Sequence, residues 1–154
     1  MFKHVLVPLD GSNLAETAIT YARQITQPGA TITLITAVDV PEYSVATYYA
    51  AGVVTEPPRQ SPSIENMIPH AREYLYSIGK LLEHDGWNIR VEAIVGDAAS
   101  TIIEVAQNKN VDAIVISTHG RSGINRWLFG SVTQKVLAAS TCPVLVVPND
   151  KKAK

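Results

Sequence analysis

The stretch AIVISTHGRSGINRWLFGSVTQKVLAA, residues 113–139, contains one complete strand, loop and helix. The run Ala113–Ser117 is largely apolar and β-branched, which predicts a buried strand. A loop with three glycines follows, and Ser131–Ala139 then begins with Ser-Val-Thr-Gln, the S-x-x-Q pattern of a capped helix start. The stretch therefore predicts a strand that leads into a helix through a glycine-rich loop.

The same alternation extends over the whole chain. Apolar runs predict four more strands, at His4–Val7, Thr31–Val38, Ile89–Val95 and Val144–Val147. Amphipathic patterns between them predict helices at Asn13–Gln27, Glu65–His84 and Ala98–Gln107. This order predicts a single α/β domain, residues 1–148, in which an open five-stranded parallel sheet has helices on both faces. Residues 149–154 are expected to be a polar C-terminal tail.

Two local patterns refine these elements. Asn13 with Glu16 forms a capping-box pattern at the first helix, and Asp97 is positioned to cap the helix that follows it. The Ile89–Val95 run alternates between apolar and polar residues, so we expect that strand nearer to an edge of the sheet.

Composition restricts the classes of partner. The 154 residues carry a net charge of -1, from 13 basic and 14 acidic residues, which gives no global attraction to nucleic acid or to an anionic membrane. The apolar runs are of strand length, too short to span a bilayer, and the first residues do not resemble a signal peptide. The single cysteine, Cys142, has no partner for a disulfide or a zinc site. We expect a cytoplasmic protein with no nucleic-acid or membrane partner and no metal bound by its own side chains.

Known catalytic motifs are missing from the sequence. It contains no G-x4-G-K-[S/T] loop, no G-x-G-x-x-G after the first strand and no G-x-S-x-G turn. These absences argue against a P-loop NTPase, a dinucleotide oxidoreductase and an α/β-hydrolase. We therefore expect no dedicated catalysis, although slow hydrolysis of a bound ligand would be compatible with these absences.

The loop between Ser117 and Ser131 has features that suit an anion. Glycines let the backbone approach a ligand closely, and the N–H groups at a helix start bind phosphate. Ser131 and Thr133 add hydroxyl groups there, and Arg121 can supply positive charge. A plain connector with Ser131 as a helix cap would use the same residues, so local chemistry leaves both interpretations open.

The spacing of this loop resembles that of a known family. Gly120 is followed by nine residues and then Gly130-Ser131, which is similar to the loop G-x2-G-x9-G-[S/T] of ATP-binding, UspA-like members of the universal stress protein family. The similarity covers nearly the whole chain, through VLVPLDGS at residues 5–12, TAVD at 36–39, Gly96-Asp97 and CPVLVVP at 142–148. The resemblance implies a Rossmann-like, adenine nucleotide α-hydrolase-like fold with strand order 3-2-1-4-5. It also implies a regulator of the stress response that binds ATP, with Mg²⁺ carried by the phosphates.

The resemblance further implies which residues form the site. Pro8 and Asp10 would lie beside the base and the ribose, where Asp10 could accept hydrogen bonds from ribose hydroxyls. Asp10 could equally be a turn former in Asp-Gly-Ser. The backbone at Ala37 and Val38 would meet the adenine edge, and Ile116 would pack near the base. The phosphates would be held by Gly120, Arg121, Gly130, Ser131, Val132 and Thr133, with His119 as a polar loop contact.

Ser117 departs from the family pattern, because it replaces the first glycine of the loop. Its Cβ resists positive φ, which would crowd a ligand that needs the backbone there. Two hypotheses follow: an ATP-responsive regulator, or a dimeric partner-binding module that takes no nucleotide. The family commonly dimerises through its last strand, and the apolar run Cys142–Pro148 would be an exposed edge in a monomer, so we expect a homodimer in either case.

Overall fold

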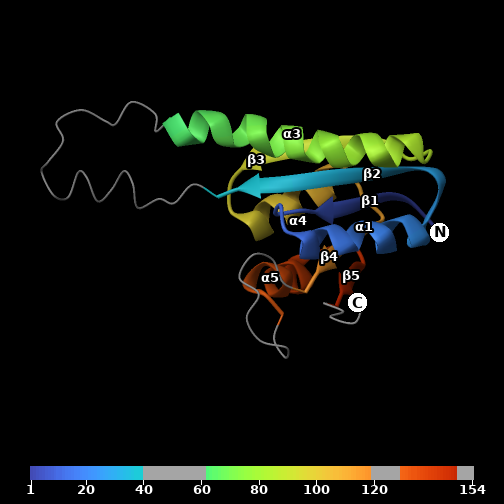
Figure 1. Ribbon diagram of the computed structural model, residues 1–154. Helices are drawn as coiled ribbons and strands as arrows, with labels where there is room; N and C mark the ends of the chain where they lie inside the picture. Colours follow the sequence, from blue (N-terminus) through green and yellow to red (C-terminus); the bar gives the residue numbers. More distant parts are fainter. Residues whose placement is uncertain (40–61, 119–128, 149–154) are drawn as a thin grey trace, which may run out of the picture.

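The chain alternates strands and helices, as Figure 1 shows. The computed structural model describes residues 1–39, 62–118 and 129–148. In chain order the elements are β1 (Phe2–Pro8), α1 (Asn13–Ile25), β2 (Thr26–Val38), α3 (Pro62–His84), β3 (Asn88–Val95), α4 (Ala98–Asn108), β4 (Ala113–Ser117), α5 (Ser131–Ala139) and β5 (Val144–Val147).

The five strands form one sheet in the order β3-β2-β1-β4-β5. Each neighbouring pair is parallel, and β1 lies in the centre, with Val5 opposite Ile32 of β2 and Ala113 of β4. The predicted α/β class, the parallel sheet and the strand order 3-2-1-4-5 are confirmed. The prediction that Ile89–Val95 lies near an edge is also confirmed, because β3 is an outermost strand.

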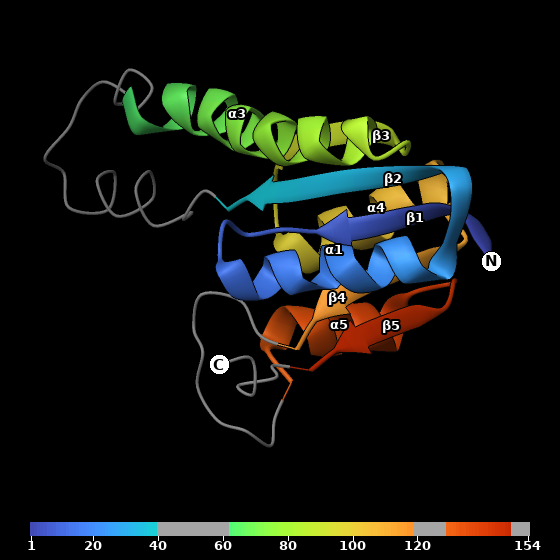
Figure 2. The same cartoon turned by 45° about the vertical axis from the view of Figure 1, so that its right-hand side comes forward.

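Both faces of the sheet are covered by helices (Figure 2), which explains why its central strands are apolar without interruption. Alternate side chains of β1 point to opposite sides. Val5 and Val7 pack with α1 and α3, whereas Leu6 packs with α4 and α5. All three side chains are fully buried. The central strand therefore anchors two separate hydrophobic layers.

Two helix starts differ from the sequence-based expectation. Ser12, not Asn13, caps α1: its Oγ accepts a hydrogen bond from the Ala15 N–H at 3.2 Å. Glu16 does not complete a capping box, because its carboxylate instead accepts a hydrogen bond from the Tyr74 hydroxyl on α3. At α5, Gly130 is the cap residue and the first helical residue is Ser131, so the predicted Ser131 cap is wrong. The predicted Asp97 cap is confirmed by its hydrogen bond from the Ser100 N–H at 2.9 Å.

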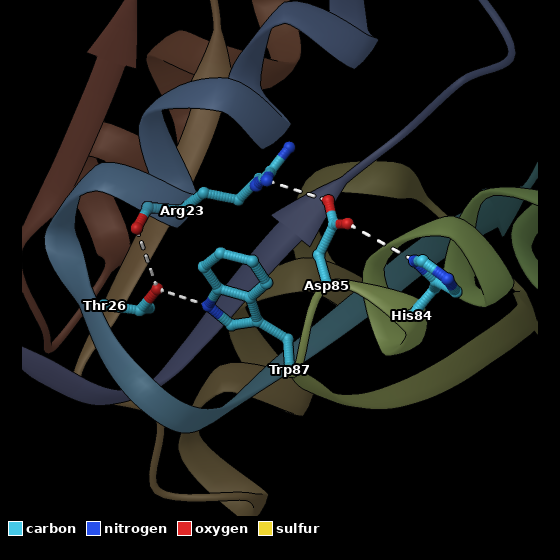
Figure 3. Close-up of polar contacts among 5 residues, drawn as sticks. All are labelled: Arg23, Thr26, His84, Asp85 and Trp87. Atoms are coloured by element: carbon cyan, nitrogen blue, oxygen red, sulfur yellow. Dashed lines mark hydrogen bonds and ion pairs between the residues drawn. The ribbon is translucent and has the colours of Figure 1, made fainter.

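A cluster of side chains joins α1 to the turn between α3 and β3, at the amino-terminal end of β2 (Figure 3). The Trp87 indole N–H donates to the Thr26 hydroxyl at 2.9 Å. The Arg23 guanidinium lies over the Trp87 ring, 4.7 Å from its centroid, and pairs with Asp85 at 2.8 Å. His84 lies beside the same carboxylate at 3.7 Å. The cluster fixes one end of the sheet through stacking, hydrogen bonding and charge.

His4 lies further along the same end of the sheet, on β1. Its Nε2 is 2.8 Å from the Thr33 hydroxyl on β2, and the adjoining backbone is held by Asp112, whose Oδ2 accepts from the His4 N–H at 2.9 Å. Burial lowers the pKa of His4, and the positive charge of Arg90 lowers it further. The fold therefore favours the neutral imidazole.

A search of the helices in the described ranges found none that is long and apolar enough to cross a membrane.

Candidate functional site

The site predicted from the sequence coincides with a cavity at the carboxyl ends of the strands, the edge toward which the arrows of β1 and β2 point in Figure 1. Its volume is about 280 Å³. The chain leaves β1 toward α1 on one face and leaves β4 toward α5 on the other. The cavity therefore lies where the direction of the connections reverses, which is the usual ligand position in open parallel sheets.

One part of the cavity wall is apolar and built from small or branched side chains. Pro8, Ile35 and Ala37 come from the ends of β1 and β2, and Ile116 comes from the end of β4. Residues of α4 close this part of the wall, namely Ala98 and Ile102. The alanines leave room where larger residues would fill the space, so this part can accept a flat apolar group.

The opposite part of the wall is the start of α5, formed by Gly130, Ser131, Val132 and Thr133. The first helical backbone bond is donated by the Gln134 N–H to the Gly130 carbonyl, at 3.0 Å. The three preceding N–H groups therefore have no partner within the helix, and no side chain of the described residues caps this start. Their residues line the cavity at the positive end of the helix dipole, where free N–H groups can bind an anion.

Thr133 secures this helix start to the sheet. Its hydroxyl donates to the Ser117 carbonyl at 3.0 Å, and the side chain is only 3% exposed. The Gly130 N–H donates to the Thr118 carbonyl at 2.8 Å. The Thr133 hydroxyl was expected as a donor to phosphate, but that donor is already used by the strand, so Thr133 can offer its backbone N–H instead.

Ser117 is the last residue of β4 and lies in register with Val147 of β5. The only non-glycine residue with positive φ in the described part of the chain is Asn110. Ser117 therefore has ordinary strand geometry, and its Cβ imposes no backbone strain in this chain. Ser117 is also one of the residues that line the cavity.

Asp10 lies between the apolar part of the cavity and the start of α1. Its Oδ1 accepts hydrogen bonds from the Ser12 N–H at 3.0 Å and from the Ser12 hydroxyl at 2.6 Å. These contacts are those of a turn-forming aspartate, and Gly11 between them has φ of 83°. Asp10 also lines the cavity, so the turn holds a carboxylate at the ligand position.

A second cavity of about 460 Å³ lies beside the first, at the end of β2 and against α3. Asp10 and Ala37 belong to the walls of both cavities, whereas Val38 and Tyr74 line only the second. Burial raises the pKa of the Tyr74 hydroxyl, and the hydrogen bond to Glu16 raises it further. Tyr74 therefore stays protonated and donates to Glu16 at neutral pH.

The starts of α4 and α5 differ in charge. Hydrogen bonds from the Ser100 N–H and hydroxyl lower the pKa of Asp97, and Lys135 lowers it further, so α4 begins beside an ionised carboxylate. No carboxylate caps α5 among the described residues. An anion in the cavity is thus favoured at α5. The described part of the chain contains no group of three or more His, Cys, Asp or Glu side chains that could hold a metal ion.

Most residues predicted for the site lie around one cavity. Nine of them line it: Pro8, Asp10, Ala37, Ile116, Ser117, Gly130, Ser131, Val132 and Thr133. Val38 lines the neighbouring cavity instead, and His119, Gly120 and Arg121 lie outside the described residues. The sequence-based prediction missed the wall residues Leu9, Ala15, Ile35, Ala98 and Ile102. Their apolar periodicity indicated burial but did not separate cavity wall from core.

Comparison with known proteins agrees with this fold. The profile of the universal stress protein family matches residues 1–148. Universal stress protein MJ0531 of Methanocaldococcus jannaschii is 33% identical over 153 residues, which cover 99% of this chain and 85% of that protein. Universal stress protein YxiE of Bacillus subtilis is 30% identical over 148 residues, covering 96% and 99% of the two chains.

Solved structures show the same architecture. The structure of MJ0577, a universal stress protein of Methanocaldococcus jannaschii, aligns with a TM-score of 0.79 at 27% identity over 96% of each chain. A universal stress protein in complex with cAMP aligns with a TM-score of 0.62 at 24% identity, covering 96% of this chain and 97% of that one. From the family match over nearly its whole length, we conclude that this chain belongs to the universal stress protein family.

Proposed function

We propose that this protein binds ATP in the cavity between the end of β1 and the start of α5, and that it acts as a nucleotide-responsive regulator of the stress response. The observation that carries the proposal is the start of α5, where three residues whose backbone N–H groups have no intrahelical partner line a largely apolar cavity. An apolar base and an anionic tail are the two chemical parts that such a cavity accommodates.

Each part of the nucleotide has a matching part of the wall. Ile35, Ala37 and Ile116 offer an apolar surface for adenine, while Asp10 offers a carboxylate to the ribose hydroxyls. The N–H groups of Ser131, Val132 and Thr133 would bind the phosphates. Mg²⁺ would arrive with ATP and be held by its phosphates. One universal stress protein with this fold was solved in complex with cAMP, which is an adenine nucleotide.

Regulation would depend on whether ATP occupies the site, and not on hydrolysis of ATP. A ligand shifts a conformational or assembly equilibrium when it binds one state more tightly than the other. The assembly we propose is a homodimer through β5, because β5 has only β4 as a neighbour and exposes Leu145. We place the protein in the cytoplasm.

The test is a direct binding measurement on the full chain. Protein purified without added nucleotide is denatured, the supernatant is analysed for adenine nucleotides, and ATP is then titrated into fresh protein by calorimetry. We expect released nucleotide or a saturable heat with one site per chain. Absence of both at high micromolar ATP would contradict the proposal.

A substitution in the helix start locates the phosphates. Gly130 has φ of -58°, which any residue can adopt, so Gly130→Val adds a side chain at the cavity wall without backbone strain. We expect this variant to lose ATP binding and to retain the weaker binding of adenosine. Unchanged ATP affinity would show that the phosphates lie elsewhere.

Ser117 supports the alternative function, a dimeric partner-binding module without nucleotide. Ser117 lines the cavity at the position of a glycine in the family pattern. If Ser117 obstructs the ligand, Ser117→Gly should bind ATP more tightly than the wild type, and the wild type should dimerise without nucleotide. Equal affinity in the two proteins would show that the serine is harmless.

A further inference from the structure

An ion pair connects the starts of the two helices that border the cavity. The Lys135 ammonium on α5 lies 3.7 Å from Oδ1 of Asp97, the residue that caps α4. Asp97 directly precedes Ala98 in the cavity wall, and Lys135 lies one helical turn after Ser131. Both side chains are more than half exposed, at 64% and 54%, so the pair is accessible to a ligand.

Lys135 is the one basic residue of the described chain on the two helices that border the cavity. None of the described residues that line this cavity is Lys or Arg. Helical side chains point back toward the helix N-terminus, so Lys135 leans toward the first turn of α5. A cation is therefore held just outside the group of backbone donors.

The chemistry of a polyphosphate needs such a cation. The N–H groups of one helix start converge on a single phosphate group. Further phosphates of a bound ATP would lie outside this first turn, beyond the three free N–H groups of α5. Each adds negative charge, which a nearby lysine would stabilise as a charge-assisted contact.

Asp97 acts in the opposite sense. Its carboxylate accepts the Ser100 N–H at 2.9 Å and the Ser100 hydroxyl at 2.8 Å, so it is fixed in place and stays ionised. It competes with phosphate for Lys135 and repels any anion placed between the two helices. Phosphate and Asp97 are therefore rival partners of one ammonium group.

We propose that Lys135 is a phosphate-binding residue that exchanges Asp97 for the outer phosphates of ATP, and that this exchange makes the site prefer nucleoside triphosphates over monophosphates. The inference rests on the proposed nucleotide site and adds a residue and a specificity to it. The stronger the ion pair between Asp97 and Lys135 is, the more weakly the site binds polyphosphates.

The first test replaces Lys135 in the full chain and compares ligands with different numbers of phosphates. Calorimetric titrations of Lys135→Met with ATP, AMP and adenosine should show ATP bound about tenfold more weakly, with adenosine unchanged. Lys135→Arg should retain most of the ATP affinity. The control is Lys109→Met, which removes the same charge from an ion pair with Glu92 and should leave all three affinities unchanged.

The second test predicts a change of opposite sign. Asp97→Asn keeps a side chain that can cap α4 but removes the carboxylate, so ATP should bind about threefold more tightly. Asp85→Asn is the matched control, because Asp85 pairs with Arg23 in the cluster of Figure 3. In Lys135→Met, the Asp97 substitution should tighten ATP binding less than it does in the wild type.

The outcomes separate the inference from the function on which it rests. Wild-type protein that binds neither ATP nor adenosine overturns both. Wild-type binding with unchanged ATP affinity in Lys135→Met overturns only the role of Lys135. An equal loss of ATP and adenosine binding in that variant also overturns it, because such a loss would be structural. A loss that increases from AMP to ATP and shrinks with added KCl supports the inference.

Discussion

Replacement of Thr133 by valine tests how the start of α5 is held against the sheet. The change exchanges a hydroxyl for a methyl group of similar shape, at a residue that is 3% exposed. It removes the hydrogen bond at 3.0 Å to the Ser117 carbonyl. The loss of one buried hydrogen bond destabilises a protein by about 1–2 kcal/mol. For a chain of this length, that loss corresponds to a decrease in Tm of about 2–8 °C.

The assay is urea denaturation followed by circular dichroism, with Thr17→Val as the matched control. The Thr17 hydroxyl also donates to a backbone carbonyl, that of Leu14 at 2.6 Å, but on the exposed side of α1. We expect the control to change the free energy of unfolding by less than about 0.5 kcal/mol. Equal effects of the two substitutions would refute the argument, since burial would then make no difference.

Three further predictions concern other parts of the fold. Gly79→Val should destabilise the protein by more than about 1 kcal/mol in urea denaturation, because a Cβ at Gly79 would lie 3.0 Å from Cγ2 of Ile89. An unchanged free energy of unfolding would contradict this close packing of α3 on β3. The pKa of His4 is lowered in the folded state. When the pH drops below about 6.5, the pKa of histidine in the unfolded chain, the unfolded state therefore binds more protons than the folded state, and the free energy of unfolding should fall. His4→Gln should flatten this part of the stability curve in urea denaturation, and a curve as steep as that of the wild type would contradict the prediction. Leu145→Glu places a charge on the exposed edge strand and should shift the proposed dimer to monomer in light scattering, and a dimer that persists would exclude this edge.

The layered fold could be predicted because its strands lie between two helical layers. Their apolar, β-branched runs identify them without reference to distant contacts. The prediction began β2 at Thr31, whereas the strand begins at Thr26 and includes Gly29 with φ of 76°. Thr26 pairs with Phe2, and the register shifts before His4. The segment Gln27-Pro28-Gly29 is therefore accommodated as an irregularity within the strand.

Helix starts were harder to predict, because several neighbouring residues can serve as caps. In Asp10-Gly-Ser-Asn13 each polar side chain is a possible cap, and the structure selects Ser12. The contact that decides the role of Glu16 comes from Tyr74, which lies 58 residues away along the chain. Local patterns cannot identify a partner that only the tertiary fold provides.

The candidate site could be predicted where residues have special chemistry and not where they are simply apolar. Gly130 and Ser131 were identified by the glycine-rich helix start and its spacing, and Asp10 by the resemblance to the family; each lines the cavity. Ile102 follows the same helical pattern as its buried neighbours, but it lines the cavity. Which apolar side chains border a gap depends on how α4 packs on the sheet, and periodicity does not contain that information.

The cluster around Trp87 lies at one end of the sheet, and the cavity lies at the other. Substitutions distant from each other usually have additive effects. Substitutions of Arg23 or Asp85 should therefore change the stability of the fold while leaving the affinity of the proposed nucleotide site unchanged. Divergent relatives could likewise acquire new ligands at one end of the sheet without losing the interactions that keep the other end folded.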